Sequence, residues 1–436
     1  MEQQLDFIKC YYRPSFFHMK IDLPVDLGDL NEITDATFAL YLHEYIHFVQ
    51  DISTIYGLMN ITTINYYIQY CAHKIYNEKK KEFEVPIKLV EKPDVKDYGV
   101  SNFNLRPIYI GSSIKNKSNS ISNFSYILEN FEYEPNKYIE KVIIKFTDNT
   151  SGENRSLEFG GNQVTEGMAY LCEQFHHKGI LPTGDAYPYK IVEEIVCFEY
   201  PEIKDDKALL ITMCDAALMS YHPGLSFIRI VKHLKQLSIH ESEDDLQTIY
   251  KSCTYLIKGS HVDFDVLADT VCIEIKRNFN AFYFDDIKDW VDTIFERIKK
   301  FRLDLPNFIN DIVVFGKPKE NKFFGSFLSL VGSPLVLDGD NNGTISLPSG
   351  FTPSTPHFSP AVFMAINQIL KVFYKTTPSR CELISFCKQS QKQDPKLTVD
   401  DNCHKSPWLK ATEKDLCPFG QIWHHWALKE YSPKYI

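Results

Sequence analysis

The sequence predicts an α+β fold that is predominantly helical. Hydrophobic residues recur at helical spacing through most of residues 186–330, and another helical stretch runs through residues 33–52. Strand-like alternation is confined to short segments such as residues 139–146 and 156–159. Because the chain has 436 residues, of which 44% are hydrophobic and 14% aromatic, it can fill the cores of two or three domains.

The N-terminal region is expected to hold a strand segment followed by two helices. Residues 8–23 alternate partly like a strand, which either pairs with extended peptide or forms an ordinary hydrophobic edge. Thr34 or Asp35 is a suitable N-cap for the first helix, and Gly57 stands where that helix should end. The second helix is expected across residues 61–81, ending in a charged, solvated run.

The first helix carries the pattern His-Glu-x-x-His at residues 43–47. His43 and His47 project from the same helix face one turn apart, so both imidazoles can reach one ion about 2.0–2.1 Å from each nitrogen. Glu44 lies on the adjoining face, where its carboxylate can hold a metal-bound water and take its proton as a general base. The helix is broadly apolar, so these polar side chains are expected in the interior. A charge buried there costs free energy unless it is paired or bound to a metal. The plain alternative is two surface histidines beside a glutamate.

This pattern resembles that of the zincin metallopeptidases, whose zinc needs a third protein ligand. The metzincin class is excluded, because Gln50 and Ser53 stand where that class has a glycine and its third histidine. The segment Glu-Gly-Met-Ala at residues 166–169 looks like the Glu-Gly-aromatic-Ala segment of the aminopeptidase-type gluzincins. The resemblance implies a zincin-like core in which Glu166 is the third ligand and Gly167 allows close helix packing.

Two features depart from the gluzincin pattern. Residues 48–165 separate the second histidine from Glu166, which far exceeds the short spacer of the aminopeptidase family. Tyr170 stands where thermolysin-like enzymes carry an aspartate that orients a histidine. A long insertion is tolerable, because the entropy of loop closure grows slowly with length. Glu166 also has a structural interpretation, as an acid favoured by the dipole at the start of a helix.

Changes in composition divide the chain into four regions. Residues 1–84 form the N-terminal, zincin-like part. Residues 85–160 are punctuated by prolines, with Ser and Asn dominating residues 112–125 before strand-like alternation begins. We expect a β-rich insertion that either walls the cleft or serves as structure alone. Residues 161–330 are then a helical domain carrying the third ligand, and residues 331–436 hold a hairpin, a helix and a Cys/His-rich tail.

Further side chains are candidates to assist the predicted site. Tyr221 and His222 stand between two predicted helices and can donate to a tetrahedral oxyanion, a role that Tyr or His fills in gluzincins. His176 and His177 compete for the same role. Asp51 lies two turns after His43 and can orient a metal-ligating side chain by hydrogen-bonding to it. Each also has an ordinary interpretation, as a polar residue at a helix end or on the surface.

The C-terminal region contains two other patterns that suggest metal. Residues 338–343 begin like a calcium-binding EF-hand loop, but Ser349 replaces the glutamate needed at position twelve, and strand-like runs flank the loop. A hairpin turn is therefore expected there, followed by a helix from Ser359 to Tyr374. The tail has many Cys and His residues without tight Cys-x-x-Cys pairs, which favours buried thiols over a second zinc.

Composition excludes several classes of function. The net charge is −10 and no basic run interleaves with aromatic residues, so nucleic acid is not an expected partner. The N-terminus carries acids where a signal peptide has a basic start, and no long apolar run follows, so we expect a cytoplasmic protein with no membrane segment. The 11 cysteines lack the regular spacing of a disulfide scaffold, which suits a reducing compartment. Abundant Lys, Ile and Asn favour a bacterial origin.

The sequence therefore predicts a zinc-dependent metallopeptidase. His43, His47 and Glu166 would bind Zn²⁺, Glu44 would activate the water, and the substrate would be a peptide or protein. The alternatives are a non-catalytic interaction or scaffold protein with a zincin fold, and a metal-dependent hydrolase of a non-peptide bond. Retention of Glu44 favours catalysis. Because a cytoplasmic peptidase needs restraint, a regulatory protein partner is a further expectation.

Overall fold

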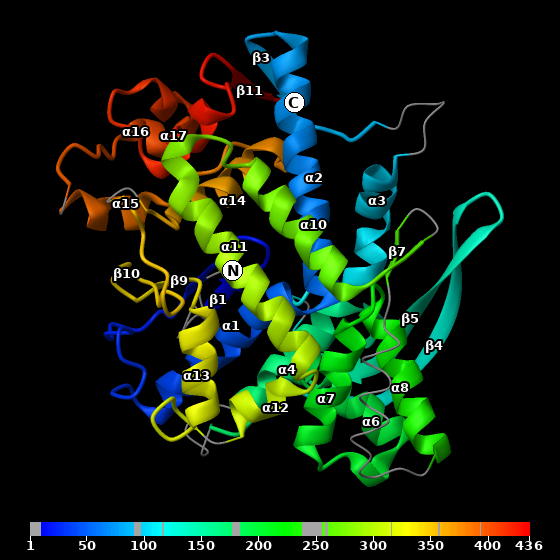
Figure 1. Ribbon diagram of the computed structural model, residues 1–436. Helices are drawn as coiled ribbons and strands as arrows, with labels where there is room; N and C mark the ends of the chain where they lie inside the picture. The colour runs from blue at the N-terminus through cyan, green and yellow to red at the C-terminus, as the bar shows by residue number, and fades with distance from the viewer. Residues whose placement is uncertain are drawn as a thin grey trace.

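The computed structural model describes the chain apart from residues 1–9, 91–96, 116, 177–183, 238–254, 258–259, 315, 356–357 and 393. Helices dominate the described part and short strands accompany them, which confirms the predicted α+β, predominantly helical fold (Figure 1). The α-helices are α1 (Asp35–Ser53), α2 (Ile55–Glu78), α3 (Tyr98–Ile110), α4 (Gly161–Gln174), α5 (Ala186–Tyr189), α6 (Ile191–Glu199), α7 (Lys207–Leu218), α8 (Pro223–Leu237), α10 (Phe264–Arg277), α11 (Asp285–Asp304), α12 (Phe308–Val313), α13 (Lys322–Val331), α14 (Ala361–Tyr374), α15 (Ile384–Gln391), α16 (Asp401–Lys405) and α17 (Pro418–His425). The strands are β1 (Tyr11–Arg13), β2 (His18–Lys20), β3 (Glu82–Val85), β4 (Ile121–Glu134), β5 (Lys137–Asp148), β6 (Asn154–Phe159), β7 (Tyr255–Ile257), β8 (Ser260–Val262), β9 (Leu335–Leu337), β10 (Gly343–Thr344) and β11 (Ser432–Tyr435).

The junction between α1 and α2 corrects one predicted boundary. α1 begins as predicted, with the Thr34 hydroxyl accepting a backbone hydrogen bond from the first turn. It ends at Ser53, because Thr54 caps α2 by accepting a hydrogen bond from the N–H of Gly57 at 3.0 Å. Gly57 therefore lies in the first turn of α2 instead of ending α1. A Cβ there would lie 2.3 Å from the carbonyl oxygen of Gln50, so only glycine lets the two helices join this closely.

A small sheet in the order β1-β2-β9-β10 lies beside α1. β1 pairs antiparallel with β2, and β2 pairs parallel with β9. β1 is the outermost of the described strands on its side of the sheet and contacts α1. The predicted strand region near the N-terminus is thus two short strands. β9 and β10 form the predicted hairpin, and in its turn Asn342 donates its backbone and side-chain N–H groups to the Asp338 carboxylate at 2.8 and 2.7 Å.

The predicted insertion contains a three-stranded antiparallel sheet in the order β4-β5-β6. β5 and β6 were expected from their alternation, and they are confirmed. β4 is an addition to the prediction, because its first residues belong to the Ser- and Asn-rich stretch that favours a loop. α3 was also not predicted; Asp97 caps it and Pro107 lies inside it. β6 leads almost directly into α4 and so fixes the start of the helix that carries Glu166.

α4 packs against α1 and α7 in the interior of the molecule (Figure 1). Its buried face includes Val164, Met168 and Leu171. A Cβ at Gly167 would lie 2.7 Å from Cγ2 of Val192 in α6, so glycine permits the close approach of α4 to α6. The packing of α4 against α1, α6 and α7 sets the position of its polar side chains relative to α1.

The C-terminal region wraps back onto the N-terminal helices. The expected helix after Ser359 is α14, which packs against α17, and β11 pairs in parallel with β3, so the C-terminus lies near the end of α2 (Figure 1). The helical spacing noted through residues 186–330 includes a helix predicted over residues 244–257. Residues 244–254 lie outside the described residues, and Tyr255–Ile257 is strand β7, so the prediction is wrong there. Among the described helices, none combines the length and apolarity needed to cross a membrane.

Candidate metal centre

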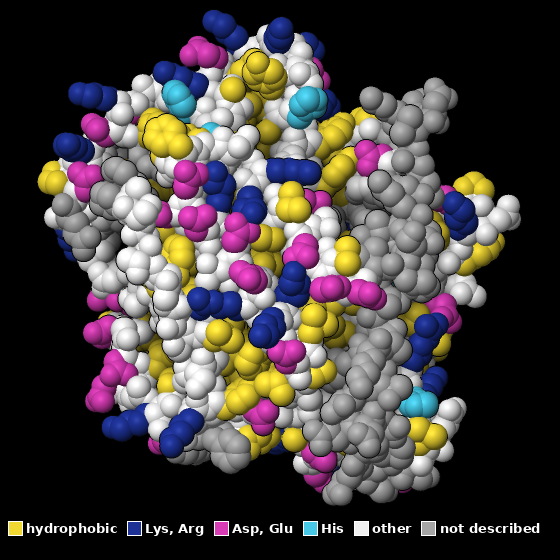
Figure 2. All heavy atoms as spheres, viewed as in Figure 1, with side chains coloured by type: hydrophobic (Ala, Val, Ile, Leu, Met, Phe, Trp, Pro, Cys, Tyr) yellow, Lys and Arg dark blue, Asp and Glu magenta, His cyan; other side chains and the backbone are white. Residues whose placement is uncertain are grey.

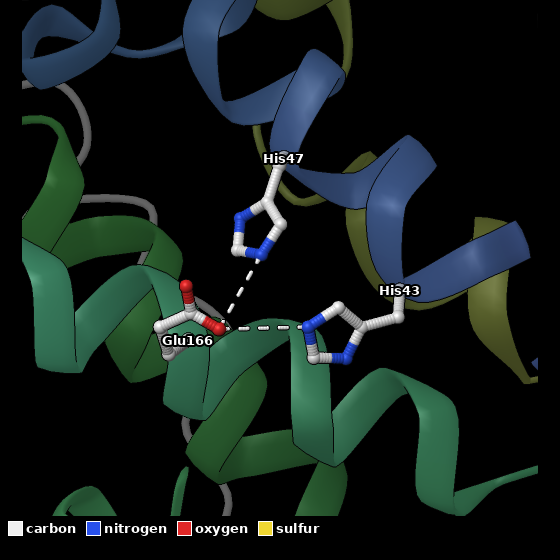
Figure 3. Close-up of side chains that lie close together, drawn as sticks. All are labelled: His43, His47 and Glu166. Atoms are coloured by element: carbon white, nitrogen blue, oxygen red, sulfur yellow. Dashed lines mark ion pairs between the residues drawn. The ribbon is translucent and has the colours of Figure 1, made fainter. Parts of the chain in front are cut away.

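Three side chains from two packed helices converge on one point. His43 and His47 lie one turn apart on α1, and both rings point to the same carboxylate oxygen of Glu166 on α4 (Figure 3). Nε2 of His43 is 3.5 Å from Glu166 Oε2, and Nε2 of His47 is 3.6 Å from it. All three side chains are largely buried, at 10–15% exposure. The structure thus brings together the three predicted ligands.

The spacing of these atoms is that of ligands around a cation. Two ligands held about 2.0–2.1 Å from a tetrahedral zinc lie about 3.3–3.4 Å apart. The observed 3.5 and 3.6 Å are close to this value and are too long for good hydrogen bonds. Among the described residues, these three form the one group of three or more potential ligands whose atoms lie within 4.8 Å of one another.

The opposite ring nitrogens of the histidines are held by other side chains. Nδ1 of His43 is 2.9 Å from the Glu173 carboxylate, and Nδ1 of His47 is 2.8 Å from the side-chain oxygen of Gln50. The amide of Gln50 in turn donates to the carbonyl of Thr165 at 3.1 Å. An acceptor at Nδ1 fixes the proton there and leaves the Nε2 lone pair for a metal.

Sequence reasoning missed Glu173 and Gln50. Glu173 follows Glu166 by two helical turns and therefore shares its face, and Gln50 follows His47 by one turn. These spacings were visible in the sequence. Their significance was not, because it depends on which face of α4 meets α1.

Asp51 was predicted to orient a metal ligand, but in the structure its carboxylate bonds to the N-terminal strand region. Its carboxylate accepts from the Tyr12 hydroxyl at 3.0 Å and from the backbone N–H of Ser15 at 2.5 Å. Burial raises the pKa of Asp51 to about 7, although both of these hydrogen bonds favour the ionised form. Asp51 therefore attaches the N-terminal strands to α1, while Glu173 and Gln50 hold the histidine rings.

Glu44 lies beside the three converging side chains. It is buried, at 7% exposure, and burial raises its pKa, while His43 and His47 pull the pKa down. The backbone N–H of Tyr12 in β1 also lowers the pKa of Glu44. A buried carboxylate next to two imidazoles and near a strand edge is positioned to receive a proton from a bound water.

The charges of these side chains strongly affect one another. Burial lowers the pKa of His43, but the attraction of the Glu166 carboxylate and the hydrogen bond to Glu173 outweigh it, so the pKa lies well above the usual value. Burial raises the pKa of Glu166, but its attraction to His47 and His43 holds the pKa far below the usual range. A buried carboxylate therefore stays ionised, with two imidazoles turned toward it, which is a donor set that suits a divalent cation.

Tyr189 is a further side chain at this group that sequence reasoning did not select. Its ring lies 6.0 Å from the ring of His43. Burial raises its pKa, and the nearby Glu166 and Glu44 carboxylates raise it further, so the phenol keeps its proton. A protonated phenol near the metal group is a suitable donor to a developing oxyanion.

The residues predicted for that donor role lie against other elements. The Tyr221 hydroxyl donates to Asn102 of α3 at 3.3 Å. Nε2 of His222 is 2.8 Å from the carbonyl of Glu140 in β5, and its other ring nitrogen accepts from the N–H of Leu225 at 3.4 Å. Both residues thus connect α8 and its preceding turn to the insertion.

The competing histidines are placed differently. Nε2 of His176 lies 2.7 Å from the carbonyl of Val313, and its ring packs edge-on against Phe38 at 5.2 Å. Val313 is the last residue of α12, so this contact joins the turn after α4 to α12. His177 lies outside the described residues.

The cysteine-rich tail contains buried thiols. Cys381, Cys387, Cys403 and Cys417 are all 6–7% exposed and free of disulfides. Burial is the largest cause of the raised pKa of Cys381, Cys387 and Cys417. These protonated side chains pack as small apolar groups, in keeping with the preferred interpretation of the tail.

The donor set, its buried position and its adjacent carboxylate together provide what metal-assisted hydrolysis requires: a cation site, a base for water and a protonated donor. No protein-family model, no curated protein and no solved structure matches this chain.

Proposed function

We propose that this protein is a zinc-dependent peptidase with a gluzincin-like centre. The observation that carries the proposal is the equal approach of two imidazole nitrogens to one Glu166 oxygen, at 3.5 and 3.6 Å, with both opposite ring nitrogens already occupied. Two histidines and a glutamate are a donor set of catalytic zinc, whose fourth position is left for water or substrate.

Each residue has a defined part in the proposed reaction. The bound zinc would lower the pKa of its water and polarise the scissile carbonyl. Glu44 takes the proton of the attacking water and passes it to the leaving amine. Tyr189 donates its phenolic hydrogen bond to the oxygen on which negative charge develops. Glu173 and Gln50 keep the two histidine rings in register during these steps.

The edge strand beside α1 favours a peptide as the substrate. Among the described strands, β1 is the outermost of its sheet; it contacts α1, and its Tyr12 N–H influences the Glu44 carboxylate. An extended peptide can add to such an edge through main-chain hydrogen bonds. This arrangement would hold a scissile bond next to Glu44 without demanding a specific side chain.

A cleavage assay with matched variants tests the proposal. Zinc-loaded wild type is incubated with a quenched-fluorescence peptide library and with casein, and Glu44→Gln and Asp51→Asn are assayed in parallel. We expect a loss of activity of about 10²–10⁴-fold in Glu44→Gln with zinc retained, because only the general base is removed. Asp51→Asn should keep most of its activity. Cleavage by Glu44→Gln at the wild-type rate would refute the assignment of Glu44.

A further inference from the structure

The two long strands of the insertion leave the body of the molecule at a well-anchored point. The Tyr126 hydroxyl of β4 donates to Glu199, and its ring lies 5.9 Å from Phe198 of α6. On β5, Glu140 receives His222 at its carbonyl and Arg229 at its carboxylate, each at 2.8 Å. Beyond these contacts the strands continue as a projecting ribbon, residues 127–139, which we call the β-arm (Figure 1).

The β-arm exposes large hydrophobic side chains. Its exposed hydrophobic residues, each 37–59% exposed, are Ile127, Leu128, Phe131, Tyr133 and Tyr138. The strand register places Ile127 beside Ile143 and Phe131 beside Ile139, so apolar side chains form a stripe along one face. Glu129 and Lys141 lie opposite each other between these two pairs, and the Lys141 ammonium is 4.1 Å from the centre of the Phe131 ring. Figure 2 shows hydrophobic side chains on the projection at the right, where Figure 1 places the β-arm. An apolar surface on a projecting element is typical of an interaction site.

The β-arm also has an outer edge with which no described strand pairs. In the order β4-β5-β6, β4 is the outermost of the described strands, and it is 14 residues long. Edge strands in natural proteins are usually short or protected by lysine, proline or a covering element. β4 contains no lysine, arginine or proline. Its outer half therefore offers main-chain donors and acceptors to an added strand.

The charge on this edge selects the kind of strand that fits. Glu129, Glu132 and Glu134 are the only charged residues of β4. Glu134 pairs with Lys137 across the turn at 2.5 Å, whereas Glu129 and Glu132 have no ion-pair partner in the described part of the chain. Opposite charges facing each other across strands stabilise a sheet, and like charges destabilise it. A second copy of this acidic strand would add acids to acids, so a basic strand is the complementary occupant.

We propose that the β-arm is a docking site for an extended polypeptide segment of a partner protein in which two basic residues, lysine or arginine, stand three residues apart among apolar residues. The segment adds as a strand beside β4, and its main-chain groups bond to the outer edge. Glu129 shares the face of Ile127 and Phe131, whereas Glu132 lies on the opposite face, so basic side chains three residues apart reach both carboxylates while apolar side chains cover Ile127 and Phe131. The proposal does not depend on catalysis, since neither edge nor stripe includes a residue of the metal centre.

Binding of a designed probe tests the proposal in the full chain. The probe is a fluorescein-labelled peptide of Val and Lys in which two Lys residues stand three positions apart, titrated with Glu44→Gln protein so that it is not cleaved. We expect saturable binding that weakens as salt is raised. Adding Glu129→Lys and Glu132→Lys should raise the Kd at least tenfold, and it should let the protein bind the corresponding peptide with Glu in place of Lys.

Matched controls separate strand addition from non-specific attraction. Phe131→Ser should weaken binding, whereas Tyr76→Ser should not, because Tyr76 is 51% exposed on α2, away from the β-arm. A Lys-Val peptide with alternate backbone amides methylated should fail to bind. Circular dichroism and zinc content confirm that each variant is folded.

Several results would overturn the proposal. They are no saturable binding even at millimolar peptide, equal binding after charge reversal, and equal binding of the methylated peptide. Sedimentation showing a wild-type dimer that Phe131→Ser dissolves would also overturn it, because the occupant of the edge would then be a second copy of the chain.

Discussion

Two buried polar clusters contact α1, and they satisfy their charges in different ways. The first cluster lies at the C-terminal end of α1, where Arg302 donates to both oxygens of Asp215 at 2.7 and 2.9 Å. Arg302 also donates to Ser53 and Pro306, so all five of its N–H donors are used. Asp215 and Arg302 are 0–2% exposed. In the middle of α1, His43 and His47 instead turn their Nε2 atoms toward Glu166 at distances beyond a good hydrogen bond.

The difference distinguishes a structural ion pair from a ligand set. A buried arginine and carboxylate persist because every donor finds an acceptor at short range. In the histidine group only the Nδ1 atoms of His43 and His47 have hydrogen-bond partners in the described part of the chain, namely Glu173 and Gln50. The Nε2 atoms and the Glu166 oxygen are spaced as ligands around a metal ion would be. The first cluster is complete as it stands, whereas the proposed cation would complete the second one.

The largest expected effect is on the complete cluster. Asp215→Ala leaves the Arg302 charge buried without its partner, and arginine does not deprotonate, so we expect a loss of about 3–5 kcal/mol in the free energy of unfolding. Glu166→Gln in chelator should cost about 1 kcal/mol, because the histidines can release their protons. Urea denaturation of both variants in EDTA measures the contrast. Equal losses would mean that the two clusters are equivalent structural ion pairs.

Added zinc should stabilise the protein through the histidine cluster and not through the Arg302 cluster. At free zinc one hundred times its Kd, wild type should gain about 2.7 kcal/mol in unfolding free energy, because the metal binds only the folded state. His47→Ala should lose this gain, and a milder disruption of the other cluster, Asp215→Asn, should retain it. Denaturation curves with and without zinc report the gain. A gain that survives His47→Ala would place the metal elsewhere.

A smaller effect, on zinc affinity, is expected when the hydrogen-bond partner of His43 Nδ1 is changed. Glu173→Gln keeps a side chain at His43 Nδ1 but removes its charge, and loss of such an outer partner weakens metal affinity by about 10–100-fold. Competition with a fluorescent zinc chelator measures the Kd. Asp51→Asn is the control and should keep wild-type affinity, because the Asp51 carboxylate bonds to Tyr12 and Ser15. The reverse order of effects would restore the orienting role predicted for Asp51.

The smallest effect concerns a buried histidine that belongs to neither cluster. Burial lowers the pKa of His18 to about 3, and its hydrogen bond to the Phe16 carbonyl does not compensate. Between pH 6.5 and 3 the unfolded chain binds a proton that the folded chain does not, so stability falls as pH falls. Lowering the pH from 6.5 to 5.5 should cost wild type about 1 kcal/mol more than His18→Gln. Identical pH dependence would show that His18 is protonated in the fold.

The sequence predicted the helix of the metal ligands because that information is local. Thr34, the apolar periodicity and the spacing of His43 and His47 all lie within a few turns of α1. Glu166 was selected through a resemblance, and the structure brings it to the two histidines. Tyr189 and Glu173 were missed because their positions depend on how α4 and α5 pack beside α1, which no local pattern encodes.

Elsewhere the errors have the same origin. Gly57 looks like a helix stop in sequence, but it is needed where α2 meets the backbone of Gln50. Tyr221 and His222 have the residue types of an oxyanion donor, whereas the structure uses His222 to hold Glu140 at the base of the β-arm. β4 begins in a polar stretch and is stabilised by its pairing with β5, a contact between segments rather than a property of either.

Metal content is the most direct test of the account. Purified wild type, Glu44→Gln, His43→Ala and Glu166→Ala are supplied with zinc, desalted and measured by mass spectrometry, with circular dichroism to establish folding. The account predicts about one zinc per chain in wild type and Glu44→Gln, and far less in the other two, because three ligands hold the metal and Glu44 does not. A metal-free wild type, or zinc that stays in His43→Ala, would contradict it.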